Sequence, residues 1–196
     1  SKEIESLCTS NRPSRAIKLF ERMRRYEPTF DTYFAIITGL CKSDAPYKAL
    51  ELLEEMKEFD LKPTVPIYNA LIAALLRSKK PALAKKTFVS MREDQGLKPN
   101  TETYDILITG YFRNNKHHDV LTTFNEMKND KIQPNEHILA TVIRATCTDN
   151  QEQGLLILQS AIEQHTINLE PSKEEILSSF TSDNIEKAQE IMRGSK

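Results

Sequence analysis

The sequence predicts an all-α fold, an α-solenoid of stacked helical hairpins, and two patterns lead to this prediction. A proline followed by a small polar residue recurs through the 196 residues at spacings of 35, 36, 35 and 37. A fixed period of this size is typical of solenoids, whose repeats contact only their neighbours. Within each period, apolar residues recur every three or four positions, as on one face of an α-helix. The prolines of the series are Pro28, Pro63, Pro99, Pro134 and Pro171.

Each period contains two predicted helices with a polar break between them. In 65–100, Pro81 is placed to open the second helix, because proline is favoured at the first helical position. One hairpin cannot bury its apolar face alone, so we expect the hairpins to stack in a single repeat domain, 1–196. We further expect the stack to form a right-handed superhelix with the first helices on its concave side. The expected divisions are a partial repeat at 1–29, full repeats at 30–64, 65–100, 101–135 and 136–172, and a shortened repeat at 173–196.

Three further positions recur in register with the prolines. A tyrosine, replaced by leucine in the fourth repeat, is expected to be buried. A glycine or alanine six residues later indicates a close helix crossing, where a larger side chain would push the helices apart. A seven-residue pair marks the second helices. These positions are Tyr33, Tyr68, Tyr104 and Leu139; Gly39, Ala74, Gly110 and Ala145; and the pairs Ala16/Met23, Ala49/Met56, Ala84/Met91, Val120/Met127 and Leu155/Ile162.

The three cysteines form no CxxC motif and no disulfide framework. Cys8, Cys41 and Cys147 occupy one equivalent position of the repeat. Buried thiols behave as small apolar side chains, so we expect buried packing at this position in preference to redox or metal chemistry.

Composition limits the possible partners. Apolar residues make up 39% of the chain, which is enough for a packed core, and the net charge is −1. A strongly basic domain is the usual mark of nucleic-acid binding, and the overall charge does not provide it. No apolar run approaches the ~20 residues of a membrane helix, so no membrane partner is expected. The first thirty or so residues resemble neither a signal nor a transit peptide.

Two stretches carry a family resemblance. "TYFAIITGLCKSDAPYKALELLEEMKEFDLKPT" (32–64) and "TYDILITGYFRNNKHHDVLTTFNEMKNDKIQPN" (103–135) resemble pentatricopeptide repeats. The tetratricopeptide repeat has a similar period but a tryptophan-containing pattern, and this chain has no Trp. The resemblance implies binding of single-stranded RNA in a mitochondrion or chloroplast, in RNA processing, stability, splicing or translation. It also implies about one base read per repeat.

In that family, the residue after the tyrosine and the last residue of the repeat read the base. The resemblance therefore implies four reader pairs, of which the second would read a pyrimidine. Asn and Asp can bond a base edge, whereas Phe and Ala cannot. The pairs are Phe34 with Thr64, Asn69 with Asn100, Asp105 with Asn135, and Ala140 with Ser172.

The positions that would wedge between bases depart from the family pattern, which is aliphatic. They are occupied by Asp31, Pro66, Glu102 and His137. Two acidic side chains near a phosphate backbone would repel it, which weighs against base-specific reading in most repeats.

A basic position recurs at the end of each first helix, in Lys42, Arg77 and Arg113. A row of cations matches the regular phosphates of a strand, and each contact releases counterions. The alternative is that basic residues here offset the helix dipole. The repeat 65–100 has a net charge of +5, whereas 136–172 has −4 and carries Thr148 at the basic position, so we expect RNA contacts in the first three repeats.

No catalytic constellation emerges, and we expect neither an enzyme nor a cofactor. His117, His118 and Asp119 lie in the expected break between two helices and lack partners at metal-site spacing. Two functions remain open. One is an RNA-binding adaptor, and the other is a structural solenoid within a larger assembly, such as an organellar ribosome, with ribosomal or other ribonucleoprotein proteins as partners.

Overall fold

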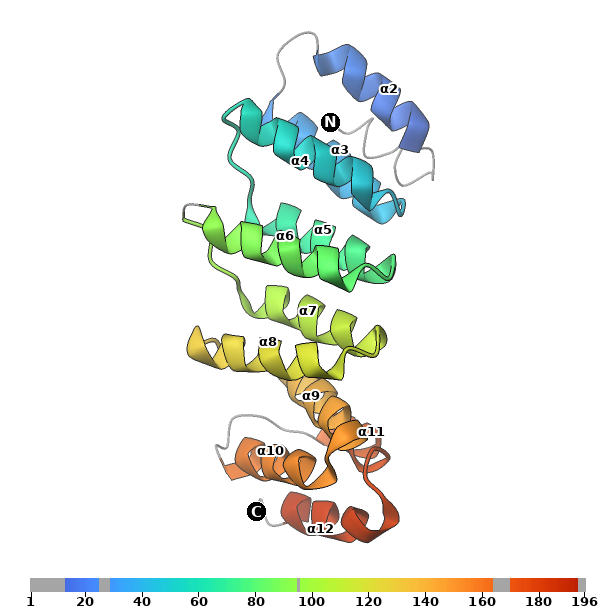
Figure 1. Ribbon diagram of the computed structural model, residues 1–196, viewed down its shortest axis with the longest axis vertical. Helices are drawn as coiled ribbons and strands as arrows, with labels where there is room; N and C mark the ends of the chain where they lie inside the picture. Colours follow the sequence, from blue (N-terminus) through green and yellow to red (C-terminus); the bar gives the residue numbers. More distant parts are fainter. Residues whose placement is uncertain (1–12, 25–28, 95, 164–169, 194–196) are drawn as a thin grey trace. The chain divides into compact units, whose positions relative to one another are not determined.

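The computed structural model describes residues 13–24, 29–94, 96–163 and 170–193, and every regular element within these ranges is a helix (Figure 1). The chain divides into two compact units, residues 1–99 and 100–196. Each unit consists mainly of antiparallel helical hairpins in which successive hairpins pack against each other. The prediction of an all-α solenoid of stacked hairpins is confirmed.

Within its described residues, the first unit contains two complete hairpins preceded by the helix α2. The helices α3 and α4 form the first hairpin, α5 and α6 form the second, and α3 packs against both α2 and α5. These helices are α2 (Pro13–Arg24), α3 (Phe30–Lys42), α4 (Pro46–Glu58), α5 (Val65–Arg77) and α6 (Pro81–Glu93).

The second unit also contains two hairpins, followed by a shorter C-terminal element. The hairpin of α7 and α8 packs against α9, which pairs with α10, and α11 and α12 then pack on α9 and α10 respectively. The elements are α7 (Thr101–Arg113), α8 (His117–Asn129), α9 (Glu136–Asp149), α10 (Gln151–Glu163), the 3₁₀ turn η1 (Glu170–Ser172), α11 (Lys173–Leu177) and α12 (Ser182–Arg193).

Local chemistry sets where the first helices begin. Thr29 and Asn100 each form a capping box with the threonine three residues later, at the starts of α3 and α7. Asn135 caps α9 by accepting from the backbone N–H of Ile138 at 2.8 Å. Such caps satisfy backbone donors that have no partner within the helix.

The recurring tyrosines lie in the first turn of the first helix in three of the hairpins. Tyr33, Tyr68 and Tyr104 have no exposed surface, which confirms the prediction of burial. Each hydroxyl donates to a carboxylate near the end of the second helix of the same hairpin. The pairs are Tyr33 with Glu55, Tyr68 with Asp94, and Tyr104 with Asp130, the last at 2.5 Å.

The buried positions of α10 lie one residue before the recurring pair of the fourth repeat. Leu155 and Ile162 are half-buried, and the buried positions are Gly154 and Ala161. The reason is the turn before α10, which consists of Asn150 alone. In the other three hairpins this turn has three residues, with a left-handed residue in the middle. Those residues are Asp44, Lys79 and Asn115, with φ of 52°, 56° and 56°.

The cysteine position is apolar where the structure describes it. Cys41 and Cys147 are free and buried, which confirms the packing prediction for these two. Burial raises the pKa of the Cys41 thiol to about 12, although the Arg77 guanidinium opposes that shift. The Cys41 thiol is therefore unreactive near neutral pH. Cys8 and the side chain of Met23 lie outside the described residues.

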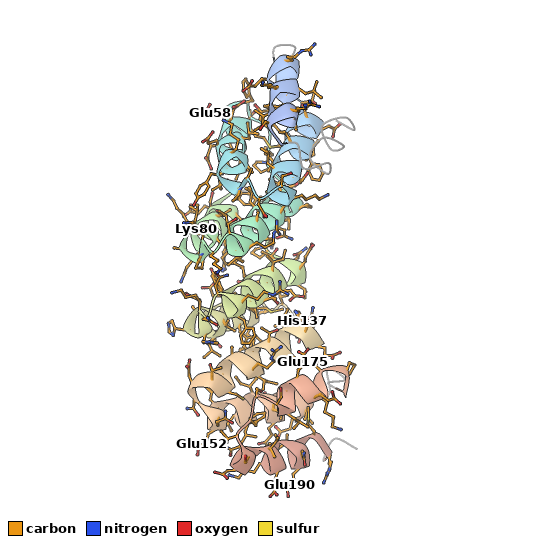
Figure 2. The ribbon with its side chains drawn as sticks, turned by 90° about the vertical axis from the view of Figure 1, so that its right-hand side faces the viewer. Glu58, Lys80, His137, Glu152, Glu175 and Glu190 are labelled. Carbon is orange, nitrogen blue, oxygen red and sulfur yellow. The ribbon has the colours of Figure 1, made fainter. Side chains whose placement is uncertain are left out.

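Charged side chains cover the outside of the helices. Glu58 and Lys80 in the first unit, and Glu152 and Glu190 in the second, are exposed to solvent (Figure 2). In the described part of the chain, none of the helices combines the length and hydropathy required to cross a bilayer.

Candidate nucleic-acid interface

A groove lies between the two first helices of the first unit. It has a volume of about 320 Å³ and is lined from both α3 and α5. Its lining residues are Phe34, Thr38, Cys41, Lys42, Ala70, Ala73 and Arg77. The helical spacing places the α3 residues on one face, at intervals of three or four. One predicted base reader and two predicted phosphate contacts therefore share one groove.

The aromatic part of the groove comes from α3. The Phe34 ring stacks on Phe30, with 5.9 Å between the ring centroids and 27° between the planes. Phe34 itself is only half-buried, and on the α5 side the groove is lined by the small side chains of Ala70 and Ala73.

The basic part of the groove lies at the ends of the two helices. Lys42 ends α3 and is exposed. Arg77 ends α5, and its guanidinium donates to the Cys41 carbonyl at 2.7 Å and lies 3.7 Å from the Asp44 carboxylate. Arg77 therefore caps the neighbouring first helix as well as lining the groove. The third predicted contact, Arg113, ends α7 in the second unit and is also exposed.

The pair Asn69 and Asn100 has a different environment from the one expected. Asn69 is 4% exposed and so belongs to the core of the first unit. Asn100 belongs to the second unit, where its side-chain oxygen accepts from the Thr103 backbone N–H at 2.9 Å. Asn69 is therefore part of the core and Asn100 caps a helix, and the spacing of the two residues in the sequence indicated neither role.

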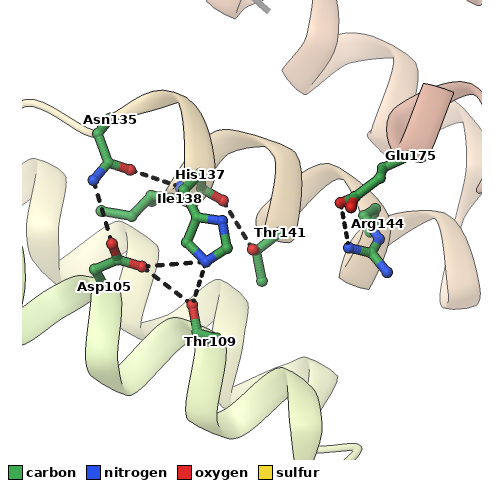
Figure 3. A network of polar contacts seen from close by, with 8 residues as sticks. All are labelled: Asp105, Thr109, Asn135, His137, Ile138, Thr141, Arg144 and Glu175. Carbon is green, nitrogen blue, oxygen red and sulfur yellow. Dashed lines mark hydrogen bonds and ion pairs between the residues drawn. The ribbon is translucent and has the colours of Figure 1, made fainter. Parts of the chain in front are cut away.

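The structure brings Asp105 and Asn135 together in the second unit (Figure 3). The Asn135 amide donates to Asp105 Oδ2 at 3.3 Å, and the Thr109 hydroxyl donates to Asp105 Oδ1 at 3.1 Å. His137 Nε2 lies 3.1 Å from the Thr109 hydroxyl and 3.7 Å from Asp105 Oδ1. We call Asp105, Thr109, Asn135 and His137 the polar cluster.

The remaining two pairs offer less polar chemistry. Thr64 precedes α5 and is half-buried, without a side-chain capping bond. Ala140 is 3% exposed, and the Ser172 hydroxyl donates to the Glu136 carboxylate at 2.6 Å.

Sequence reasoning missed Arg144, which lies on α9 one turn before Thr148. Its guanidinium lies 5.0 Å from the centre of the Phe112 ring and donates to Glu175 at 2.9 Å (Figure 3). Arg144 occupies the repeat position of Thr38 and Thr109, five residues after the tyrosine position. Arg144 lies on the face of α9 and not at the end of the helix, where the basic residues of the other repeats lie.

The histidine pair lies on a helix and not in a break, contrary to expectation. His117 and His118 are the first two residues of α8, followed by Asp119. The turn ends one residue before them because Asn115 already reverses the chain in a left-handed conformation. The His117 ring packs edge-on against Phe112, with 5.8 Å between the centroids.

Family models match most of the sequence. The model described as the PPR repeat family matches residues 63–112 and 99–148, and the one described as PPR repeat matches residues 4–27 and 31–61. No curated protein matches the chain.

Solved structures show the same fold. The pentatricopeptide repeat protein PPR10 from maize matches with a TM-score of 0.76 and 21% identity, over 97% of this chain and 28% of its own. PPR10 in complex with an 18-nt psaJ RNA element matches at 0.67 and 15%, over 98% of this chain and 29% of its own. The PPR domain of Arabidopsis thaliana protein-only RNase P 1, in complex with tRNA, matches with a TM-score of 0.67 and 10% identity. This match covers 98% of this chain and 96% of that domain.

The chain thus spans less than a third of the length of the maize protein. The helical hairpins, the repeat period and the segments matched by the family models nevertheless all indicate the same repeat. The chain belongs to the PPR repeat family.

Proposed function

We propose that the chain binds single-stranded RNA, as an adaptor in organellar RNA processing, stability, splicing or translation. The observation that carries this proposal is the groove in which Lys42 and Arg77, from successive repeats, lie together. Both charged residues that line the groove are basic, which suits a phosphate backbone. Two structural neighbours are in complex with RNA, one with an 18-nt element and the other with tRNA, which supports RNA binding.

The chemistry of this binding is positional and electrostatic. The two cations at the helix ends would hold phosphates, and the helix-to-helix packing would set their spacing. Base reading by amides is a weaker part of the proposal, because Asn69 is buried and Asn135 already bonds Asp105. We therefore expect affinity without strong sequence preference, and single strands preferred to duplexes.

The test replaces Lys42, Arg77 and Arg113 by Glu and measures RNA affinity against salt concentration. Each lost contact on a single strand lowers the slope of log K against log salt by about 0.7, so the triple change should lower it by about two. Arg77 caps the Cys41 carbonyl, so a second triple with Gln keeps a donor there while removing the charge.

A control of the same size changes three exposed lysines of the first unit that do not line the groove, Lys80, Lys86 and Lys98, to Glu. The slope should change less in this control than in the variant that changes Lys42, Arg77 and Arg113. If the wild-type chain has no measurable affinity for single-stranded RNA at low salt, the proposal is wrong.

The second candidate function is a structural solenoid within a larger assembly, such as an organellar ribosome. The observation that favours it is the fourth repeat, 136–172, which has a net charge of −4 and whose Ser172 and Arg144 already bond carboxylates. This role predicts little RNA affinity and no salt slope, together with co-purification of protein partners from the native source.

A further inference from the structure

The groove between α3 and α5 has the two chemical features that a nucleotide needs at its two ends. An aromatic ring, Phe34, lies at one end, and the cations Lys42 and Arg77 lie at the other. Phe34 and Lys42 are eight residues apart on one helix, which is about 12 Å along its axis. The long side chain of Lys42 can shorten that distance.

The volume and lining of the groove suit one small ligand. About 320 Å³ is near the lower end of the range for small-molecule sites, which are mostly apolar with a few charged groups. Thr38, between the aromatic and basic ends, donates its hydroxyl to the Phe34 backbone carbonyl at 2.6 Å. Its hydroxyl proton is thus used within the helix, and the middle of the groove offers a ligand few hydrogen-bond donors.

The Phe34 ring is also held in place. It stacks on Phe30 and packs against the core of the first unit, so little side-chain freedom remains to be lost on binding. A phenyl ring cannot hydrogen-bond a base edge, but every base has a face that stacks on one. Phe34 can therefore contact a base only by stacking, whereas Asn69 and Asp105 carry groups that can hydrogen-bond a base edge.

We propose that this groove binds one nucleotide of single-stranded RNA by stacking any base on Phe34, with an adjacent phosphate at Lys42 and Arg77. The site is thus a sequence-independent anchor and not a base reader. This inference rests on the proposed RNA binding and adds a ligand position to it.

The absence of Trp from the chain allows a direct test. Phe34→Trp keeps an aromatic face and introduces one fluorophore. Adding oligo(U) or oligo(A) of about ten nucleotides should quench its fluorescence, and an abasic strand of equal length should not. Tyr47→Trp places the same fluorophore on α4 outside the groove, where Tyr47 is 53% exposed, and it should not be quenched.

Affinity measurements complete the test. Phe34→Leu keeps an apolar side chain against Phe30 but removes the aromatic face, and it should lower affinity for oligo(U) and oligo(A) alike by about tenfold. The salt slope should not change, because no cation is lost. Tyr47→Ala is the matched control and should bind as the wild type does.

The outcomes separate the two proposals. Salt-dependent binding that is unchanged in Phe34→Leu, with no quenching at position 34, overturns the stacking site and leaves RNA binding intact. Loss of affinity for one base alone also overturns the inference, because it indicates base reading. No RNA binding by the wild type at low salt overturns both. Equal loss for both strands, with base-dependent quenching, supports the anchor.

Discussion

The same repeat positions carry opposite chemistry in the two units. In the first unit, Phe34 and Lys42 line a groove that is open to a ligand. In the second unit, the position of Phe34 is taken by Asp105, which accepts hydrogen bonds from Asn135 and Thr109. The backbone at both places is an α-helix of 13 residues. The hairpin scaffold therefore fixes where a side chain is presented, and its neighbours decide whether it is available.

The two regions should also affect RNA affinity differently. The groove, with an aromatic ring and two cations, can increase the affinity for any single strand. The Asp105 carboxylate adds negative charge, and its oxygens already accept hydrogen bonds from Asn135 and Thr109.

The largest expected effect in the second unit comes from Gly154→Ala. A Cβ at this position would lie 2.4 Å from the Cys147 sulfur, so either the buried Cys147 side chain must rotate away or α9 and α10 must move apart. We expect a loss of about 1–3 kcal/mol in the free energy of unfolding, measured by denaturant titration. Because solenoid repeats depend on their neighbours, amide exchange should rise in α9 and α10 and change little in α3 and α4.

Cys147→Ala provides the control, since it removes the sulfur that the new methyl group would meet. The double variant should recover part of the stability lost in Gly154→Ala. Additive losses in the two variants would show that the sulfur is not the obstacle.

The tyrosine–carboxylate hydrogen bonds should stabilise the first and the second unit by similar amounts. Tyr68→Phe and Tyr104→Phe each remove a donor to a carboxylate, from Asp94 and Asp130 respectively. Hydrogen bonds to charged groups contribute about 1.5–3 kcal/mol, and losses of that size are expected in chemical denaturation. A loss confined to one unit would mean that the hairpins are not stabilised alike.

The stability that depends on Tyr68 should vary with pH. Burial, and then the hydrogen bond to Asp94, raise the pKa of the Tyr68 phenol above its usual value. The folded state favours the protonated form, so this contribution is complete below the unfolded pKa of about 10. It is lost as the pH rises through the higher folded-state pKa. Tyr68→Phe should therefore lose less stability than the wild type as the pH rises above about 10, as measured by thermal melts.

The smallest predicted effect is on RNA affinity and has the opposite sign to that of Phe34→Leu. Asp105→Asn removes a negative charge from the polar cluster while keeping an oxygen that can accept from Asn135. Two exposed charges about 4 Å apart interact by about 1 kcal/mol in water, and less at greater distances. Affinity for single strands should rise by about threefold at low salt, and the gain should disappear at high salt. A fall in affinity would indicate that Asp105 contacts the strand as a base reader.

Much of the fold could be predicted from the sequence because helical repeats are periodic along the chain. The proline series and the tyrosines identified the hairpins, and the basic residues Lys42, Arg77 and Arg113 do end their helices as expected. Each of these features depends on the 3.6-residue period and on local start and stop chemistry. The shift of one residue in α10 was missed because it arises from a turn shortened to Asn150, and a period alone does not show turn geometry.

The availability of the candidate site residues was decided by tertiary structure. Asn69 and Asp105 occupy the same repeat position, yet one is buried and the other accepts from Asn135 across thirty residues of sequence. Arg77 reaches the Cys41 carbonyl of the preceding hairpin, which spacing along the chain could not indicate. Periodicity determines which face of a helix a residue occupies. Burial and hydrogen bonding depend on which side chains the neighbouring helix brings opposite it, and that contact exists only once the hairpins have stacked.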